Sequence, residues 1–85
     1  MQAVKGMRKD LEDLLSSVCI KYGFCIHDPE VSEIVKKDSI NAEEFASLVL
    51  LAEGMNPEYE VKHFRTLRNA FIEKFGNSVS VEDYK

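Results

Sequence analysis

The apolar run from Ile40 to Gly54 constrains the fold more than any other part of this chain. It begins with Asn41, a residue typical of helix N-caps, and Glu44 three residues later can complete a capping box with it. Gly54 can adopt the left-handed conformation in which many helices end. The segment therefore predicts a helix bracketed by Asn41 and Gly54.

This helix has almost no polar face. Apolar side chains point around most of its circumference, at Ala46, Leu48, Val49, Leu50, Leu51 and Ala52. A helix that is apolar all round lies in the interior of a protein, so we expect the rest of the chain to cover it. Two neighbouring helices would leave part of this surface free, which favours binding to a partner or to a second copy, whereas three helices could cover it completely.

Three further helices are predicted around the central one. In each, apolar residues recur at the three- and four-residue spacing of an amphipathic helix. The second and the last also begin with proline followed by glutamate, which suits the first turn of a helix. Their approximate limits are Met7 and Gly23, Asp28 and Lys37, and Pro57 and Phe75.

The chain is therefore expected to form an all-α fold, a compact bundle of four helices in the order long, short, central apolar and long. We expect one domain over residues 1–85, with flexible ends at 1–6 and 77–85, and no internal repeat. Residues 77–85 could also fold back as a short extended segment. The expected core consists of Phe45, Val49, Leu15, Val18, Phe64 and Phe71.

Composition narrows the classes of protein and the compartment. The 85 residues carry a net charge of −4, which argues against general attraction to nucleic acid or anionic lipid. The start of the chain has no apolar run typical of a signal peptide, and no apolar run is long enough to cross a bilayer. We therefore expect a cytoplasmic protein that does not bind membranes. Cys19 and Cys25, six residues apart, match no redox or zinc pair and are expected to be reduced.

Residues 37–45 resemble the second half of an EF-hand calcium loop, in which a glutamate precedes an aromatic residue. With Glu44 as the last ligand, however, two positions that need oxygen ligands hold Val35 and Lys37. Neither side chain can coordinate calcium. Glu44 is better explained as a capping residue, and no calcium site is predicted.

Candidates for catalysis or metal binding are few. Cys25 and His27 could form a zinc site or a nucleophile–base pair with Cys19 or His63, but no known ligand spacing connects them. The four glycines never cluster, so no phosphate-binding loop is present. The sequence therefore predicts no enzyme, no catalytic residue, no metal and no cofactor.

The last predicted helix carries the bases on which an alternative function depends. Residues 43–56 loosely resemble a helix-turn-helix, which would make the last helix a DNA-reading helix. Glu58 and Glu60 at its start would face the phosphates unfavourably. Nucleic-acid binding is therefore kept as the alternative, and its bases would be Lys62, Arg65, Arg68 and Lys74.

Arg68 has two interpretations because it falls within the apolar stripe of its helix. A guanidinium keeps its charge when buried, so Arg68 would reach to the edge of the core or pair with Asp28, Glu30 or Asp38. It could instead anchor an acidic partner. The expected function is a small non-catalytic helical module that binds another protein or itself, with candidate partner-binding residues Lys62, Arg65, Arg68 and Asn69.

Overall fold

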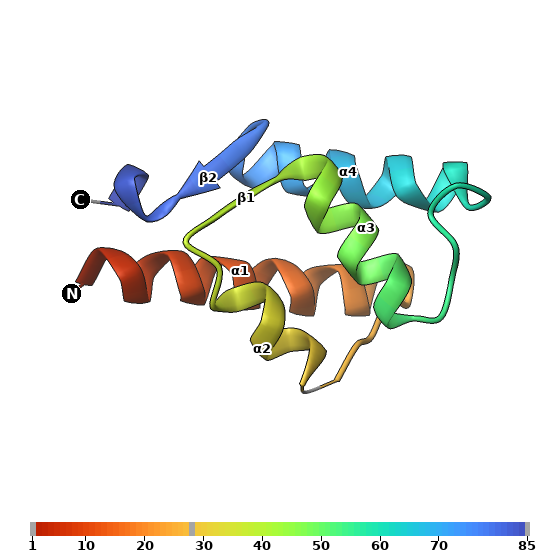
Figure 1. The fold of residues 1–85 in the computed structure, drawn as a ribbon, viewed down its shortest axis with the longest axis horizontal. Coiled ribbons are helices and arrows are strands. Elements are labelled where there is room, and N and C mark those ends of the chain that lie inside the picture. The colour runs from red at the N-terminus through yellow and green to blue at the C-terminus, as the bar shows by residue number, and fades with distance from the viewer. Residues whose placement is uncertain (1, 28, 85) are drawn as a thin grey trace.

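The computed structural model describes the backbone of residues 2–27 and 29–84, and the side chains of these residues from position 6 onward. The prediction of four helices is confirmed, but a small two-stranded sheet and a 3-10 turn accompany them (Figure 1). The predicted all-α bundle is thus correct only in its helices. The elements are α1 (Gln2–Tyr22), α2 (Glu30–Val35), β1 (Ser39–Asn41), α3 (Ala42–Ala52), α4 (Val61–Phe75), β2 (Ser78–Ser80) and η1 (Val81–Tyr84).

Both ends of α3 form as the sequence predicts. At the start, the Asn41 side-chain oxygen accepts a hydrogen bond from the backbone N–H of Glu44 at 2.7 Å. At the end, Gly54 adopts a φ of +79°, and the N–H of Met55 donates to the carbonyl of Leu50 at 2.8 Å. The Gly54 N–H donates to the carbonyl of Leu51 at 3.0 Å, which completes a Schellman motif.

One detail of the predicted capping box differs. The carboxylate of Glu44 pairs with Lys37, which comes just before β1, at 3.2 Å. Glu44 therefore connects the start of α3 to the segment that precedes β1.

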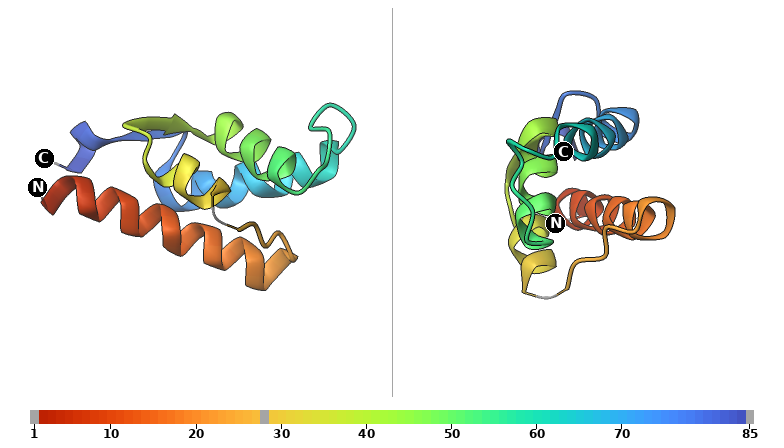
Figure 2. Two further views of the ribbon diagram at one scale, coloured as in Figure 1. Left: turned by 60° about the horizontal axis from the view of Figure 1, so that its bottom comes forward. Right: turned by 90° about the vertical axis from the view of Figure 1, so that its right-hand side faces the viewer.

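The other helices cover α3 from two directions. In the end-on view, α2 and α3 lie on one side of the molecule, and α1 and α4 lie on the other (Figure 2). The ring of Phe45 on α3 packs 5.4 Å from that of Phe71 on α4, which in turn packs 4.9 Å from Phe75. The predicted core is confirmed as buried at Phe45, Val49, Leu15, Val18 and Phe71, whereas Phe64 is only half-buried.

Part of the predicted apolar circumference of α3 is left uncovered. Val49 and Leu50 are fully buried, but 59% of Leu51 is exposed and Leu48 is half-buried. The three surrounding helices therefore bury most of α3 and leave Leu51 at the surface.

The strands β1 and β2 reveal an internal repeat that we did not expect from the sequence. They pair antiparallel with Ile40 opposite Val79, and each strand leads directly into a helical turn. The two-fold relation between the antiparallel strands, which exchanges Ile40 and Val79, matches residues 38–45 (Asp-Ser-Ile-Asn-Ala-Glu-Glu-Phe) with residues 77–84 (Asn-Ser-Val-Ser-Val-Glu-Asp-Tyr). The substitutions are conservative at most positions, so the prediction that nothing repeats is wrong.

The hydrogen bonds follow the same two-fold relation. The N–H of Ala42 donates to the carbonyl of Asn77, and the N–H of Val81 donates to the carbonyl of Asp38, both at 2.9 Å. Two similar segments thus close against each other through equivalent backbone bonds. Residues 77–84, expected to be flexible or to fold back, do fold back.

Two helix starts differ from the prediction. The first helix begins at Gln2 rather than near Met7. The last begins at Val61 rather than at Pro57, because Asn56 organises a separate turn: its side-chain oxygen accepts from the Glu58 N–H at 2.9 Å. The Asp28 cap predicted for the second helix lies outside the described residues.

The positions of two apolar side chains follow from these helix limits. Val61, at the first position of α4, is 57% exposed instead of lying in the buried stripe. Tyr22, at the last position of α1, is 49% exposed. At both helix ends, the apolar spacing continues beyond the part of the helix that contacts the core.

Tyr84 fixes the end of the repeat to α1. Its hydroxyl donates a hydrogen bond to the carboxylate of Asp10, and its ring lies against Gly6. A Cβ at Gly6 would lie 3.0 Å from that ring, so any larger residue would require the ring to shift by a few tenths of an ångström. Burial, the hydrogen bond to Asp10 and the negative charges of Asp10 and Asp83 raise the pKa of Tyr84 to about 12.

We expect Tyr84→Phe to lower the free energy of unfolding by about 1 kcal/mol at pH 7, because it removes the hydrogen bond to Asp10. The raised pKa means that Tyr84 stabilises the fold below pH 10, and that this contribution is lost as the pH rises towards 12. Urea unfolding at pH 7 and pH 11 should therefore show the two proteins converging in stability at the higher pH. Tyr59→Phe, at an 80% exposed position, is the control and should leave the free energy of unfolding unchanged at both pH 7 and pH 11. A difference between wild type and Tyr84→Phe that is constant with pH would contradict this role.

Candidate functional site

The outer face of α4 carries the residues predicted to bind a partner. Lys62, Arg65 and Asn69 are exposed and follow one another at helical spacings of three and four, so they lie along one side of the helix. Arg68, between them in sequence, is half-buried and turned towards α3. The structure thus brings Lys62, Arg65 and Asn69 together as an exposed row, which Arg68 borders.

Arg68 lies in a surface groove of about 390 Å³ between the start of α3 and the second half of α4. Its Nε atom is buried and has no hydrogen-bond partner among the described residues. The predicted ion pairs with Glu30 and Asp38 do not form, and Asp28 lies outside the described part of the chain. The groove is lined by Asn41, Ala42, Glu43, Arg68, Ile72 and Asn77.

We did not predict that Asn41 and Asn77 would line the same groove as Arg68. They are brought together by the pairing of β1 with β2, in which Asn41 lies opposite Ser78, the residue after Asn77. The resemblance between residues 38–45 and 77–84 was the signal that could have predicted this contact.

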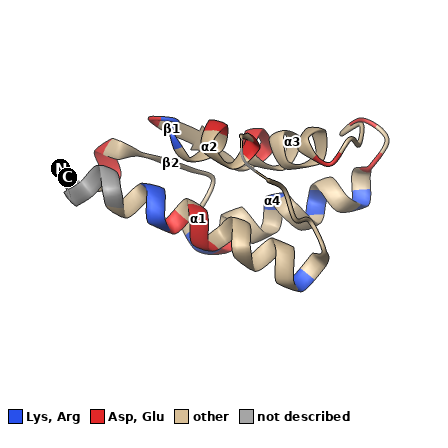
Figure 3. Ribbon diagram, turned by 90° about the horizontal axis from the view of Figure 1, so that it is seen from below, with Lys and Arg blue, Asp and Glu red and all other residues tan. Residues whose placement is uncertain are grey.

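The charges of the α4 face are free to interact with a partner. Within residues 6–27 and 29–84, the lysines that form ion pairs are Lys9, Lys36 and Lys37, none of which belongs to α4. Lys62, Arg65 and Arg68 form no ion pair with any of these residues. Figure 3 shows basic positions at several turns of α4. An acidic domain therefore presents a local row of unpaired positive charge.

Lys74 lies apart from this row. It lines a groove of about 240 Å³ between α1 and α4, together with Lys21 and Tyr22 of α1. Arg68 lines the groove on the α3 side of the same helix. The four bases proposed for nucleic-acid binding are thus distributed over different sides of α4.

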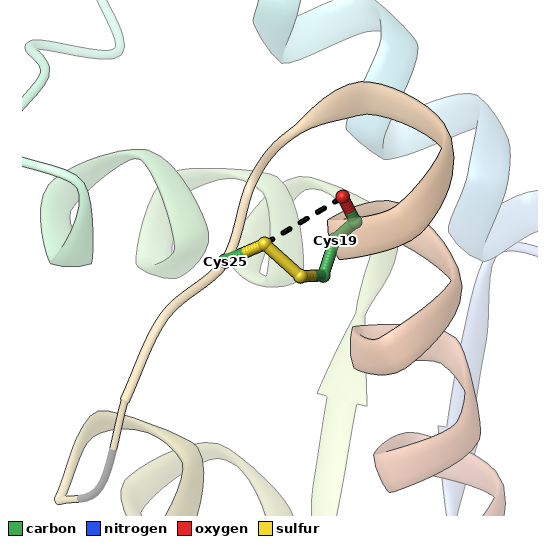
Figure 4. Close-up of a disulfide and its surroundings, with 2 residues drawn as sticks. All are labelled: Cys19 and Cys25. Atoms are coloured by element: carbon green, nitrogen blue, oxygen red, sulfur yellow. Dashed lines mark hydrogen bonds between the residues drawn. A yellow bond between two sulfur atoms is a disulfide. The ribbon is translucent and has the colours of Figure 1, made fainter.

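The prediction of reduced cysteines is wrong in this structure, because Cys19 and Cys25 form a disulfide (Figure 4). The chain turns sharply after α1: the Gly23 N–H donates to the carbonyl of Cys19 at 3.0 Å, and the Phe24 N–H donates to that of Val18 at 3.2 Å. This turn returns the next residue, Cys25, to the side of Cys19, with 4.3 Å between the Cα atoms. Spacing alone could not predict the bond, because it arises from the turn.

The disulfide also removes the candidates for a zinc site or a catalytic thiol. A sulfur in a disulfide is no thiolate, so neither cysteine can act as a ligand or nucleophile in this state. His27 is exposed. The ring of His63 lies edge-on to that of Phe24, with 5.2 Å between the ring centroids, and its Nε2 atom lies 3.8 Å from the carboxylate of Glu60. In the part of the chain that the structure describes, no three His, Cys, Asp or Glu side chains are grouped so that they could hold a metal ion.

Two further findings concern membrane spans and similarity to known proteins. None of the described helices combines the length and apolar character needed to cross a membrane. No protein-family model, no curated protein and no solved structure matches this chain.

Proposed function

We propose that this protein is a non-catalytic helical module that binds an acidic segment of a partner protein through the outer face of α4. The observation that carries the proposal is the state of Arg68, whose buried Nε atom lacks a hydrogen-bond partner among the described residues. The side chain as a whole is half-buried and lines the groove, so its charge would gain from a partner carboxylate that enters there. Lys62 and Arg65, exposed and without ion pairs, supply the surrounding positive charge.

The geometry suits a partner that lies along α4. Carboxylates on its surface would meet Lys62 and Arg65 first, and one of them would enter the groove beside Arg68 and Ile72. Asn69 can donate or accept hydrogen bonds at the edge of the same face. The exposed charges would mainly steer association, whereas Arg68 would determine how slowly the complex dissociates.

We expect the double substitution Lys62→Glu and Arg65→Glu to abolish capture of the partner, because it reverses the charge of the face without altering buried residues. The test is affinity capture from a lysate of the source cells, with and without nuclease, using wild type and the variant. The matched control is Lys9→Glu with Lys36→Glu, which changes the net charge equally at exposed sites outside α4. Equal capture by both variants would contradict the proposal.

Nucleic-acid binding remains the alternative function, and the same experiment separates it. It predicts that captured material is released by nuclease, and that a 20-base-pair duplex binds at low salt with an affinity that falls steeply as salt rises. The separation of Lys74 from Arg68 on α4 favours the protein partner.

Self-association is the second form of the protein-binding proposal. The exposed Leu51 supports it, because this side chain leaves an apolar contact available on the central helix. Sedimentation velocity at micromolar concentration distinguishes self-association from binding of an acidic partner protein. A strict monomer would exclude self-association and leave the acidic partner as the proposal.

A cytoplasmic location belongs to the same proposal. Disulfides persist mainly in oxidising compartments, so a cytoplasmic protein of this fold would hold Cys19 and Cys25 largely as thiols. Trapping of free thiols in intact source cells measures which state is present.

A further inference from the structure

A second groove, on a different face from Arg68, is lined mainly by apolar residues and carries one acidic residue, Glu12. It lies between α1 and α2, has a volume of about 420 Å³, and is lined by Leu15, Cys19 and Ile20 of α1, Val31 of α2 and Ile26 of the connecting segment. The spacing of the α1 residues places them along one face of that helix. On α1 the groove therefore presents an apolar strip of Leu15, Cys19 and Ile20, with Glu12 and Ser16 also in its lining.

Ile20 is the most exposed large apolar side chain among those described, at 83%. A single exposed apolar residue needs no explanation, but this one borders a groove that Leu15, Ile26 and Val31 also line. The disulfide fixes one of these walls, because Cys25 ties the segment that contains Ile26 to Cys19. In the disulfide-bonded state, this wall of the groove is therefore held against α1.

The charges around the groove indicate the kind of partner. Glu12 lines it, and Glu30 precedes Val31 on its α2 side; neither glutamate forms an ion pair within the described residues. No lysine or arginine is among the lining residues. An apolar strip with free carboxylates beside it complements a helix that has an apolar face flanked by bases.

We propose that this groove docks a cationic amphipathic helix of a partner protein. Apolar side chains of that helix, three and four residues apart, cover Ile20, Ile26 and Val31. Its lysines or arginines pair with Glu12 and Glu30. This surface is independent of the α4 face, which has the opposite charge preference, so either proposal can fail without the other.

The test uses two synthetic 18-residue amphipathic helices with the same apolar pattern, one of leucine and lysine and one of leucine and glutamate. Their binding to the full chain is measured by isothermal titration calorimetry at physiological salt. We expect the lysine helix to bind and the glutamate helix not to bind. Equal binding of both helices would overturn the charge complementarity on which the proposal rests.

The variants Ile20→Glu and Val61→Glu locate the site. Both replace an exposed apolar residue and add the same negative charge. Ile20 on α1 is 83% exposed, and Val61 on α4 is 57% exposed. General charge attraction would make both variants bind the lysine helix more tightly. We expect Ile20→Glu instead to weaken binding at least tenfold, and Val61→Glu to stay within twofold of wild type. Unchanged or tighter binding by Ile20→Glu, or an equal loss in both variants, would overturn the proposal.

Discussion

Phe45→Ala is expected to lower the free energy of unfolding by about 3–5 kcal/mol, the largest effect of any single substitution considered for this protein. Phe45 is fully buried on α3, and its ring packs against Phe71 of α4. Truncation removes the transfer free energy of the ring and leaves a cavity between two helices that are both held in place elsewhere. A domain of 85 residues has about 4–13 kcal/mol of total stability, so the substitution removes about a quarter or more of it and would leave a protein at the lower end of that range largely unfolded at room temperature.

Leu51→Ala is the matched control for this prediction. It shortens an apolar side chain on the same helix, but Leu51 is 59% exposed and should contribute less than about 0.5 kcal/mol. Urea unfolding followed by circular dichroism measures both variants. Similar losses at Phe45 and Leu51 would mean that α3 does not have the buried and exposed faces described above.

The second large effect concerns the disulfide. We expect Cys25→Ser to lower the free energy of unfolding by about 2 kcal/mol, because it frees a loop of six residues that the bond closes in the unfolded chain. Cys25 itself is exposed, so the substitution removes the cross-link without creating a cavity. Phe24, which is buried beside it, would then depend on packing alone to stay in the core.

Reduction of the wild-type protein provides the control for this effect. Wild type in dithiothreitol should have the stability of Cys25→Ser, and the variant should not respond to dithiothreitol at all. If wild type is equally stable with and without the reductant, the bond contributes nothing and the fold is held by its core.

The helices were predictable because their signals are local. The cap at Asn41 and the left-handed Gly54 act through hydrogen bonds to residues a few positions away, and both appear as expected. Local signals also misled at α4, where Pro57 and Glu58 are typical of a helix start. There, Asn56 accepts the Glu58 N–H with its side chain, and this turn delays the helix until Val61.

The features that escaped prediction depend on long-range contacts. The pairing of residues 39–41 with 78–80 and the hydrogen bond from Tyr84 to Asp10 join segments that are far apart in the sequence. The disulfide spans only six positions, but it depends on the turn that follows α1. The candidate site was likewise predicted only in part. The exposed positions of Lys62 and Arg65 follow from helical spacing, whereas the groove around Arg68 depends on the pairing of β1 with β2.

Native-state hydrogen exchange tests most directly the central claim that the rest of the chain assembles around α3. We expect the backbone amides of Phe45, Val49 and Leu50 to exchange only through global unfolding, with protection close to the total free energy of unfolding. Amides of the short helix α2 should exchange faster through local opening. If the α3 amides exchange as fast as those of α2, α3 is not the buried centre of this protein.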